Sequence, residues 1–253
     1  PLNVARMITN FDIFTNPTKL TPYRDSEDGH AAANNQQPRN YLIARRSSTV
    51  NAIFALSRTT ATDRVHIQMK FLTTGAATDL DDNGWDTPSN NEASQNVPAY
   101  DLFVYYRRTG LIYGAHSGTH IWAFDPSSVA AFVNTHLAVT YTNVAQGLVH
   151  SKDDILYVPL DNTIWKNDNG TWSLALTLPA HFVITSICEM GNNIAIAMAP
   201  LTGAVVGQSR VFIWDRDTSV TTLSETIPWE EGQLQILEVI DGYLMGVSLS
   251  GNS

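Results

Sequence analysis

The chain has 253 residues, of which 43% are hydrophobic and 15% are charged. The apolar fraction is too high for a disordered chain, and the charged fraction lies below the roughly 25% that is usual for soluble domains. The formal net charge is −9. Residues 127–253 carry 4 basic and 12 acidic side chains, so nearly all of this charge lies in the second half. An acidic surface repels phosphate backbones, which argues against nucleic acid as a partner.

Five pairs of short apolar runs, each joined by a tight turn, predict five β-hairpins along the chain. They cover Asn40–Ser57, Asp101–Ser117, Gly147–Leu160, Ile184–Ala199 and Gln235–Leu249. Their turns contain Ser-Ser, Thr-Gly, Asp-Asp, Gly-Asn-Asn and Asp-Gly. These residues accept positive φ or bond back to their own backbone, as hairpin turns require. The chain therefore repeats one supersecondary unit.

A third apolar run follows each of the first four hairpins. These runs are Asp63–Phe71, Gly118–Asp125, Asn162–Asp168 and Ser209–Asp217. Trp122, Trp165 and Trp214 recur within the last three runs, and we expect them to occupy equivalent, largely buried positions. A fourth run is clearest at Thr171–Leu178 and at Ser219–Ile227.

Four strands per unit at a period of about 40–50 residues is typical of a β-propeller. The sequence thus predicts an all-β fold, a β-propeller of four-stranded antiparallel blades, with four complete repeats plus a partial fifth. A β-sandwich is the alternative, but it does not predict a Trp that returns in the third strand of successive units. The segment Ser127–Leu137 is the one with a helical period, and we expect it to be a short helical decoration.

The predicted domains are an N-terminal strand or arm with a polar linker at residues 1–37 and the blades at residues 38–253. Within the arm, Val4–Phe14 is a plausible strand. A partial fifth blade exposes a strand edge, and natural proteins rarely leave such an edge bare. The partner strand is expected to come from residues 1–37, from further blades beyond Ser253 in a longer parent chain, or from another subunit. No segment approaches the roughly 20 apolar residues of a membrane span.

One long loop, Gly75–Tyr100, contains half of a calcium-binding pattern. Asp79, Asp81 and Asn83 have the alternate spacing that converges oxygens on a hard cation, and Gly84 follows at the turn position. The position that should supply a bidentate Glu is Asn90. Two interpretations stay open: a Ca²⁺ site, or a solvated acidic loop.

Catalytic patterns are sparse. Arg45, Arg46, Arg107 and Arg108 fall at the same point of two successive hairpins, just before the turns. They are either solvated residues that flank the turns or an anion pocket on one rim. No motif combines a nucleophile, a base and an orienting group, so we expect a non-enzymatic protein with no cofactor. Cys188 lies in an apolar run and is expected to be a small buried side chain.

Two segments resemble known families. The segment Asn167–Trp172, NDNGTW, resembles the Asp-box turn of sialidase-like propellers, a structural turn that is remote from chemistry. The segment Ile8–Asp28, ITNFDIFTNPTKLTPYRDSED, followed by Tyr41–Arg46, YLIARR, resembles the opening of β-propeller-like virion proteins of tailed bacteriophages. This second resemblance implies a structural, multi-copy assembly protein located in the virion.

Two function classes follow from the sequence. The first is a non-enzymatic structural component of a phage virion, associated with the tail or a fibre, whose partners are other virion proteins or copies of itself. The second is an extracellular propeller that binds or cleaves carbohydrate, with surface glycans as partners. The orientation of Trp122, Trp165 and Trp214 discriminates between them, because core indoles are not available to read glycans.

Overall fold

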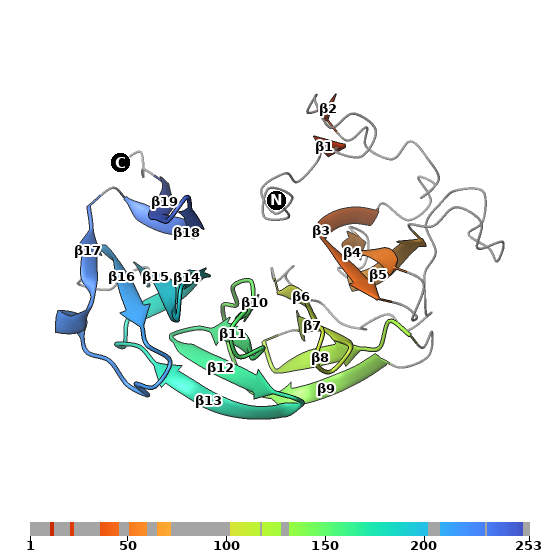
Figure 1. Cartoon of the computed structure of the whole chain (residues 1–253), viewed down its shortest axis with the longest axis horizontal. Coiled ribbons are helices and arrows are strands. Elements are labelled where there is room, and N and C mark those ends of the chain that lie inside the picture. The colour runs from red at the N-terminus through yellow and green to blue at the C-terminus, as the bar shows by residue number, and fades with distance from the viewer. Residues whose placement is uncertain are drawn as a thin grey trace. The chain divides into compact units, whose positions relative to one another are not determined.

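The computed structural model describes residues 11–12, 21–22, 36–45, 51–59, 65–71, 102–116, 118–127, 132–201, 208–230 and 232–249. Within these ranges the regular elements are β-strands and one short 3-10 helix, and the fold is an all-β fold of the β-propeller class (Figure 1). The chain divides into two compact units, Pro1–Asn96 and Val97–Ser253. None of the described segments is a helix long and apolar enough to cross a membrane.

Within its described residues the first unit contains two antiparallel sheets. One pairs β1 (Phe11–Asp12) with β2 (Thr21–Pro22), and the other contains β3 (Gln36–Arg45), β4 (Asn51–Thr59) and β5 (Val65–Phe71). The predicted first hairpin and its third run are therefore confirmed. The fourth strand expected for this repeat falls at residues 72–101, outside the described residues.

The described residues of the second unit form three four-stranded antiparallel sheets, or blades, followed by a hairpin. The first blade is β6 (Phe103–Tyr106), β7 (Leu111–His116), β8 (His120–Phe124) and β9 (Phe132–Ala138). The second is β10 (Leu148–Val149), β11 (Leu156–Leu160), β12 (Thr163–Asp168) and β13 (Thr171–Thr177). The third is β14 (Phe182–Met190), β15 (Asn193–Pro200), β16 (Ser209–Trp214) and β17 (Ile227–Trp229). The hairpin is β18 (Gln233–Ile240) and β19 (Tyr243–Leu249), so every predicted hairpin is confirmed.

Tight turns join the strands where the sequence places Asn, Asp and Gly. Asn169 and Gly170, with φ of 50° and 94°, connect β12 to β13. Asp241 and Gly242, with φ of 49° and 82°, connect β18 to β19. Two residues with positive φ form the hairpin turn whose twist matches that of the flanking strands. The buried Asn167 side chain also accepts a hydrogen bond from the Gly170 N–H at 2.7 Å, which fixes the NDNGTW turn.

Successive blades of the second unit bury their apolar faces against one another. Alternate side chains of a strand point to opposite faces, so each inner strand contributes to two cores. Tyr157 of β11, for example, lies in a different core from its neighbours Leu156 and Val158. The core between the β6–β9 and β10–β13 blades contains Leu102, Tyr106, Tyr113, Ile121, Leu156 and Val158. The next contains Tyr157, Ile164, Ile194, Ile196, Met198 and Trp214, and the last contains Cys188, Ala195, Ala197, Val211, Leu234 and Leu237.

The helix expected at Ser127–Leu137 is wrong in its described part, which is strand β9 from Phe132 onward. β9 pairs with β8, with Phe132 opposite Phe124. The apolar spacing of this segment fits a helix taken alone. As a strand, the segment hydrogen-bonds to the outer main-chain N–H and C=O groups of β8 and completes a four-stranded blade. A helix at this position would leave those groups without main-chain partners.

The fourth strand expected at Ser219–Ile227 is also wrong, because the strand that pairs with β16 is β17, which begins where that segment ends. Val220 forms a parallel bridge with Thr177 at the outer edge of β13. The 3-10 helix η2 (Leu223–Glu225) follows, and the Thr222 N–H donates to the Glu225 carboxylate at 2.6 Å. A Thr followed three residues later by Glu is a helix-start signal, and this signal competes locally with the strand pattern.

The recurring tryptophans share a face but not a register. Trp122 and Trp214 are 1% and 0% exposed, and Trp165 is half-buried. An Asp ends β12 and directly follows β8 and β16, and two of these residues, Asp125 and Asp215, accept a main-chain N–H from two residues later. Aligned by these Asp residues, Phe212 lies level with Trp122 and Trp165, whereas Trp214 lies two residues further along. The expected equivalence is thus wrong for Trp214, although a shift of two residues preserves the face.

Candidate functional site

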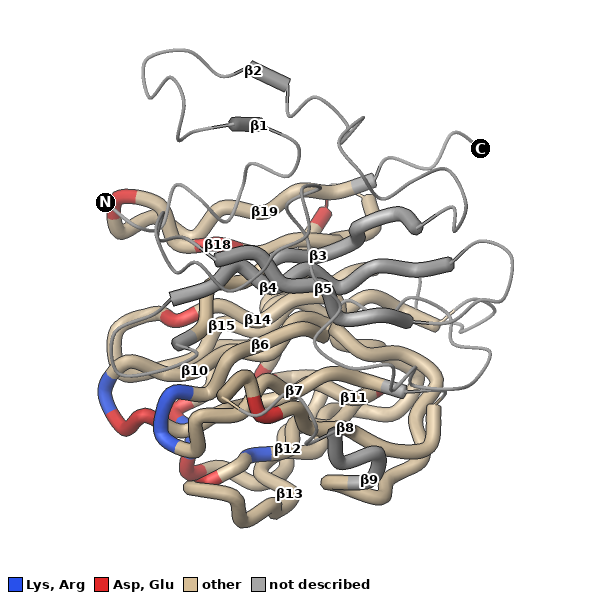
Figure 2. Tube along the Cα trace, turned by 90° about the vertical axis from the view of Figure 1, so that its right-hand side faces the viewer, with Lys and Arg blue, Asp and Glu red and all other residues tan. Residues whose placement is uncertain are grey.

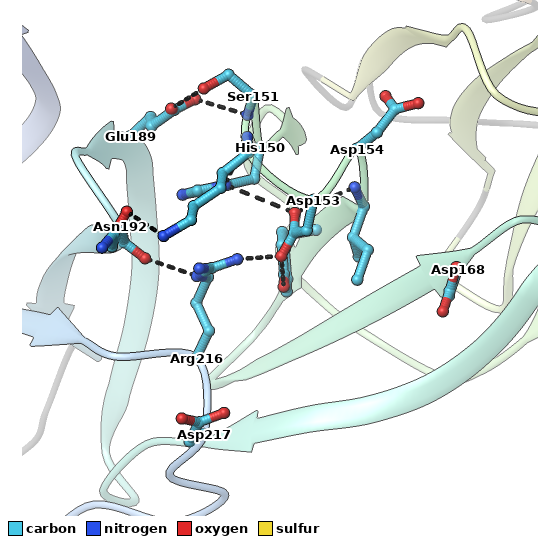
Figure 3. Close-up of polar contacts among 12 residues, drawn as sticks. His150, Ser151, Asp153, Asp154, Asp168, Glu189, Asn192, Arg216 and Asp217 are labelled. Atoms are coloured by element: carbon cyan, nitrogen blue, oxygen red, sulfur yellow. Dashed lines mark hydrogen bonds and ion pairs between the residues drawn. The ribbon is translucent and has the colours of Figure 1, made fainter.

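Many of the Lys, Arg, Asp and Glu residues of the second unit lie in turns at one end of its blades, although Asp161, Arg210 and Glu225 lie elsewhere (Figure 2). In an antiparallel blade the turn after the first strand and the turn after the third strand lie at the same end. We therefore define the polar rim by these turns, residues 107–110, 150–155, 169–170, 191–192 and 215–218. Figure 3 shows the contacts within its central part.

Asp153 in the β10–β11 turn is the centre of the polar rim (Figure 3). Its carboxylate accepts a hydrogen bond from Arg216 Nη1 of the next blade, and Arg216 Nε donates to the Asn192 carbonyl at 2.7 Å. The Tyr157 hydroxyl lies 3.4 Å from the same carboxylate. Burial, followed by the charge of Asp153, raises the pKa of Tyr157 to about 12. The Arg216 guanidinium is thus already paired and forms a link between two blades.

A second set of contacts joins the same two blades. The main-chain N–H of Ser151 donates to Glu189 Oε2 at 3.0 Å, and the Ser151 hydroxyl donates to Glu189 Oε1. Lys152 Nζ donates to Asn192 Oδ1 at 2.7 Å. These bonds run from one turn to its neighbour, so they fix the relative position of adjacent blades.

The first and second blades are connected at the polar rim in the same way. Arg108 Nη1 lies 2.6 Å from Asp168 Oδ1, and both side chains are well exposed. The buried Tyr106 donates its hydroxyl proton to the Asp154 carbonyl at 2.7 Å and accepts the Asn169 N–H at 3.2 Å. These contacts favour the solvated-turn interpretation of the arginines over an anion pocket.

Of the other predicted rim arginines, Arg107 is exposed in its turn and Arg45 ends β3 in the first unit. Arg46 lies outside the described residues, as do the calcium candidates Asp79, Asp81 and Asn83. Where the chain is described, no cluster of three His, Cys, Asp or Glu side chains has the geometry to hold a metal ion.

His150 is a polar-rim residue that the sequence analysis did not single out. It is fully buried, and its Nδ1 accepts the Lys152 N–H at 3.3 Å and lies 3.5 Å from Asp153 Oδ1. Its Nε2 has no hydrogen-bond partner among the described residues. Ser151, His150 and Asp153 are the residue types of a hydrolytic triad, but the Ser151 hydroxyl donates to Glu189 and not to the imidazole. The base therefore does not activate the nucleophile.

Several aromatic side chains of the second unit are packed between its blades. Trp172 and His136 join the interface of the first two blades, where Trp172 Nε1 donates to His136 Nδ1 at 2.8 Å. The Tyr113 ring lies edge-on to both rings, and its centroid is 5.1 Å from that of His136 and 5.6 Å from that of Trp172. Burial lowers the pKa of His136, which favours the neutral ring that this bond requires.

Cys188 behaves as expected from its apolar surroundings. It is 4% exposed, and burial raises its pKa to about 12, with the charge of Glu238 adding to the effect. A thiol with a raised pKa is a poor nucleophile. Cys188 is therefore a core residue.

Comparison with known proteins adds a similarity in structure. No family description and no curated protein matches the sequence. The structure is similar to a solved structure titled "Crystal structure of BBS1N in complex with ARL6DN, soaked with mercury", with 12% identity and a TM-score of 0.41. The match covers 84% of this chain and 64% of that chain, so the chain spans less than two thirds of that protein.

Proposed function

We propose that this chain is a non-enzymatic structural component of a phage virion, associated with the tail or a fibre, in which the propeller is an assembly module. The resemblance of Ile8–Asp28 and Tyr41–Arg46 to the opening of phage virion propellers supports this proposal. The observation that carries it is the hairpin β18–β19. Tyr243, Met245 and Val247 on one face of β19 are 75%, 54% and 52% exposed.

Exposed aliphatic and aromatic residues that repeat along a strand mark a surface that binds another protein. At the polar rim, by contrast, the described ion pairs and hydrogen bonds join the blades of the chain to one another. The partners are therefore other virion proteins or copies of the chain. The location is the virion.

The decisive experiment is to find the chain in purified particles. Deletion of its gene in the parent phage should give particles that lack part of the tail or a fibre in electron micrographs. Complementation with Val247→Lys should fail to restore that part, whereas complementation with Leu174→Lys should restore it, because Leu174 is equally exposed (50%) but lies on β13. Complete and infectious particles from the deletion mutant would refute the proposal.

The proposal includes no catalysis and no cofactor. A purified chain should release no sugar from a panel of sialosides and bacterial surface polysaccharides, because the Ser151 hydroxyl is directed to Glu189. Sugar release that disappears in Asp153→Asn would contradict this expectation and would favour the carbohydrate-cleaving alternative.

A further inference from the structure

The turn that joins β12 to β13 contains the pair Asn169-Gly170, which the proposed function does not use. Both residues are exposed, and their φ values of 50° and 94° are positive. A two-residue turn with positive φ at both positions favours Asn followed by Gly. A Cβ atom on Gly170 would meet nothing within 4 Å, so the positive φ, and not crowding, accounts for glycine here. The fold therefore favours this pair of residue types.

Asn followed by Gly is also a chemically labile pair. The main-chain nitrogen of Gly170 can attack Cγ of the Asn169 side chain, because glycine has no side chain that would shield its nitrogen. A C–N bond forms, the proton of the Gly170 N–H passes to solvent, and the bond from Cγ to Nδ2 breaks. The Nδ2 nitrogen takes up a proton and leaves as ammonia. Water then opens the cyclic imide at either of its two carbonyl groups, which leaves an aspartate or an isoaspartate at this position.

The side chain of Asn167 holds the nucleophile of this reaction. Its Oδ1 accepts the Gly170 N–H at 2.7 Å, and Asn167 is 0% exposed. The attacking nitrogen must lose this proton, and a short hydrogen bond to a buried acceptor opposes the loss. The reaction is thus slowed by a residue that is not itself modified.

A second hydrogen bond fixes the other side of the turn. The Asn169 N–H donates to the hydroxyl of the buried Tyr106 at 3.2 Å, and that hydroxyl donates to the Asp154 carbonyl at 2.7 Å. Ring closure requires the Gly170 nitrogen and Asn169 Cγ to approach each other in the right alignment. The two bonds hold the main chain on both sides of Asn169, which restricts the rotation by which the reacting atoms would align.

The turn between β18 and β19 provides a contrast. Its residues Asp241 and Gly242 have φ of 49° and 82°, close to the values of the first turn. The position that corresponds to Asn167, two residues before the turn, is Val239, whose side chain has no hydrogen-bond acceptor. This turn contains Asp, which has no amide nitrogen to lose as ammonia. Of these two turns, the one with the labile amide is the one with the buried acceptor.

We propose that Asn169 is a modification site, at which spontaneous loss of ammonia yields aspartate and isoaspartate, and that the Asn167 side chain sets the rate. Asn167 is a positioning residue, since it acts on the Gly170 N–H and is not itself changed. The native turn keeps the conversion slow, and opening of the turn makes it fast. This inference does not depend on the virion role.

The modification matters for the interface of the first two blades. Thr171 lies opposite Asp168 and Trp172 opposite Asn167, so the two-residue turn sets the register of this ladder. An isoaspartate adds one methylene to the main chain, which does not fit that turn. Trp172 also donates to His136 of β9. A displaced β13 therefore loses a hydrogen bond to the neighbouring blade.

The test compares Asn169 in the purified full chain with the same residue in a synthetic peptide of residues 165–173. Both are incubated at mildly alkaline pH, where the Gly170 nitrogen loses its proton more readily. Mass spectrometry of fragments detects the replacement of the amide NH2 by OH at Asn169, and chromatography separates the aspartate and isoaspartate products. We expect the folded chain to convert at least about tenfold more slowly than the peptide, because the fold keeps the reacting atoms out of alignment.

Three variants test the role of Asn167. Asn167→Ala removes the acceptor and should accelerate the conversion of Asn169 by about two- to tenfold, the range of one lost hydrogen bond. The matched control is Asn162→Ala, which removes an amide that bonds the Leu178 carbonyl just before β12. This control should leave the rate unchanged. Asn167→Asp keeps an oxygen acceptor at the same place and should convert as slowly as the parent.

Near-ultraviolet circular dichroism verifies that each variant folds. If Asn167→Ala does not fold, Tyr106→Phe takes its place, because it removes the hydroxyl that accepts the Asn169 N–H. This variant should also accelerate the conversion.

Four results would overturn the inference. They are conversion of the folded chain as fast as the peptide, equal rates in the parent and in the variant that lacks a turn hydrogen bond, accelerated conversion in Asn167→Asp, and equal acceleration by Asn162→Ala. The last result would mean that general loosening of the blade, and not the acceptor at Asn167, sets the rate.

Discussion

Gly114 in β7 lies directly opposite Trp122 in β8, and the indole occupies the space that a side chain would need. A Cβ atom at Gly114 would lie 2.0 Å from Trp122 Cζ2. Trp122 is 1% exposed, so its ring has little room to move. We expect Gly114→Ala to lower the free energy of unfolding by roughly 2–3 kcal/mol, as overpacked cores do.

Chemical denaturation of Gly114→Ala, Trp122→Leu and the double variant tests this expectation. The smaller side chain in Trp122→Leu removes the clash, so adding Gly114→Ala to it should cost less than in the parent. Equal costs in both backgrounds would show that Gly114 is required for another reason.

Cys188 gives the chain an alkaline dependence of stability. A thiol with an ordinary pKa of 9.0 ionises in the unfolded chain, whereas the folded chain holds its proton until pH about 12. Between these values the unfolded state binds fewer protons, so the free energy of unfolding falls as pH rises. Cys188→Ala should lose stability less steeply over this range in urea titrations. Tyr157, with a pKa of about 12, is present in both proteins and so does not alter the comparison. Identical slopes would contradict a protonated, buried thiol.

At the scale of an element, one buried hydroxyl anchors the hairpin β18–β19. Ser209 is 1% exposed, and its hydroxyl accepts the Leu234 N–H. Ser209→Ala leaves that N–H buried without a partner, which should cost about 1–3 kcal/mol. Hydrogen exchange should accelerate in β18 and β19 and stay unchanged in the β6–β9 blade. Ser224→Ala, at an exposed site in η2, is the control and should alter neither.

The elements predicted correctly are those in which local pattern and pairing agree. The hairpins have alternating apolar residues and turn residues that accept positive φ, and both signals survive in the fold. The prediction of a helix at Ser127–Leu137 was wrong because the apolar spacing of this segment fits both a helix and a strand. Only its pairing with the edge of β8 decides for the strand. The prediction of a fourth strand at Ser219–Ile227 was wrong because Val220 in this segment pairs with Thr177 of β13. These two residues are far apart in the sequence, so the sequence does not reveal their contact.

The candidate site was predicted less well than the fold. The position of Arg108 at a turn was foreseen, but its partner Asp168 lies 60 residues away in the next blade. His150 has no spacing signal at all, and its burial follows from the packing of two blades. Contacts between blades depend on the rotation of one sheet against the next, and hydrophobic periodicity carries no information about that rotation.

At the scale of the whole molecule, the second unit is a row of blades coupled through shared cores. Trp214 lies in the core between the β10–β13 and β14–β17 blades, where its ring is edge-on to Tyr157 at 5.5 Å. Trp214→Ala should lower the free energy of unfolding by roughly 3–5 kcal/mol, and Trp165→Ala should lower it less because Trp165 is only half-buried. Because the core belongs to both blades, hydrogen exchange should increase in both. An increase confined to β14–β17 would show that the blades unfold independently.

The turn after Met190 and the bulge at Thr185 in β14–β15 recur 50 positions later in β18–β19. This repeat has a consequence for how such a chain can grow. Tandem duplication of residues 182–231 would insert a blade whose bulge, turn and buried hydroxyls recur in register. Ser209 and its copy would each face the main-chain N–H that they are placed to receive. The gene could thus lengthen by whole modules that keep the same turn and bulge, and the number of blades becomes a variable on which selection can act.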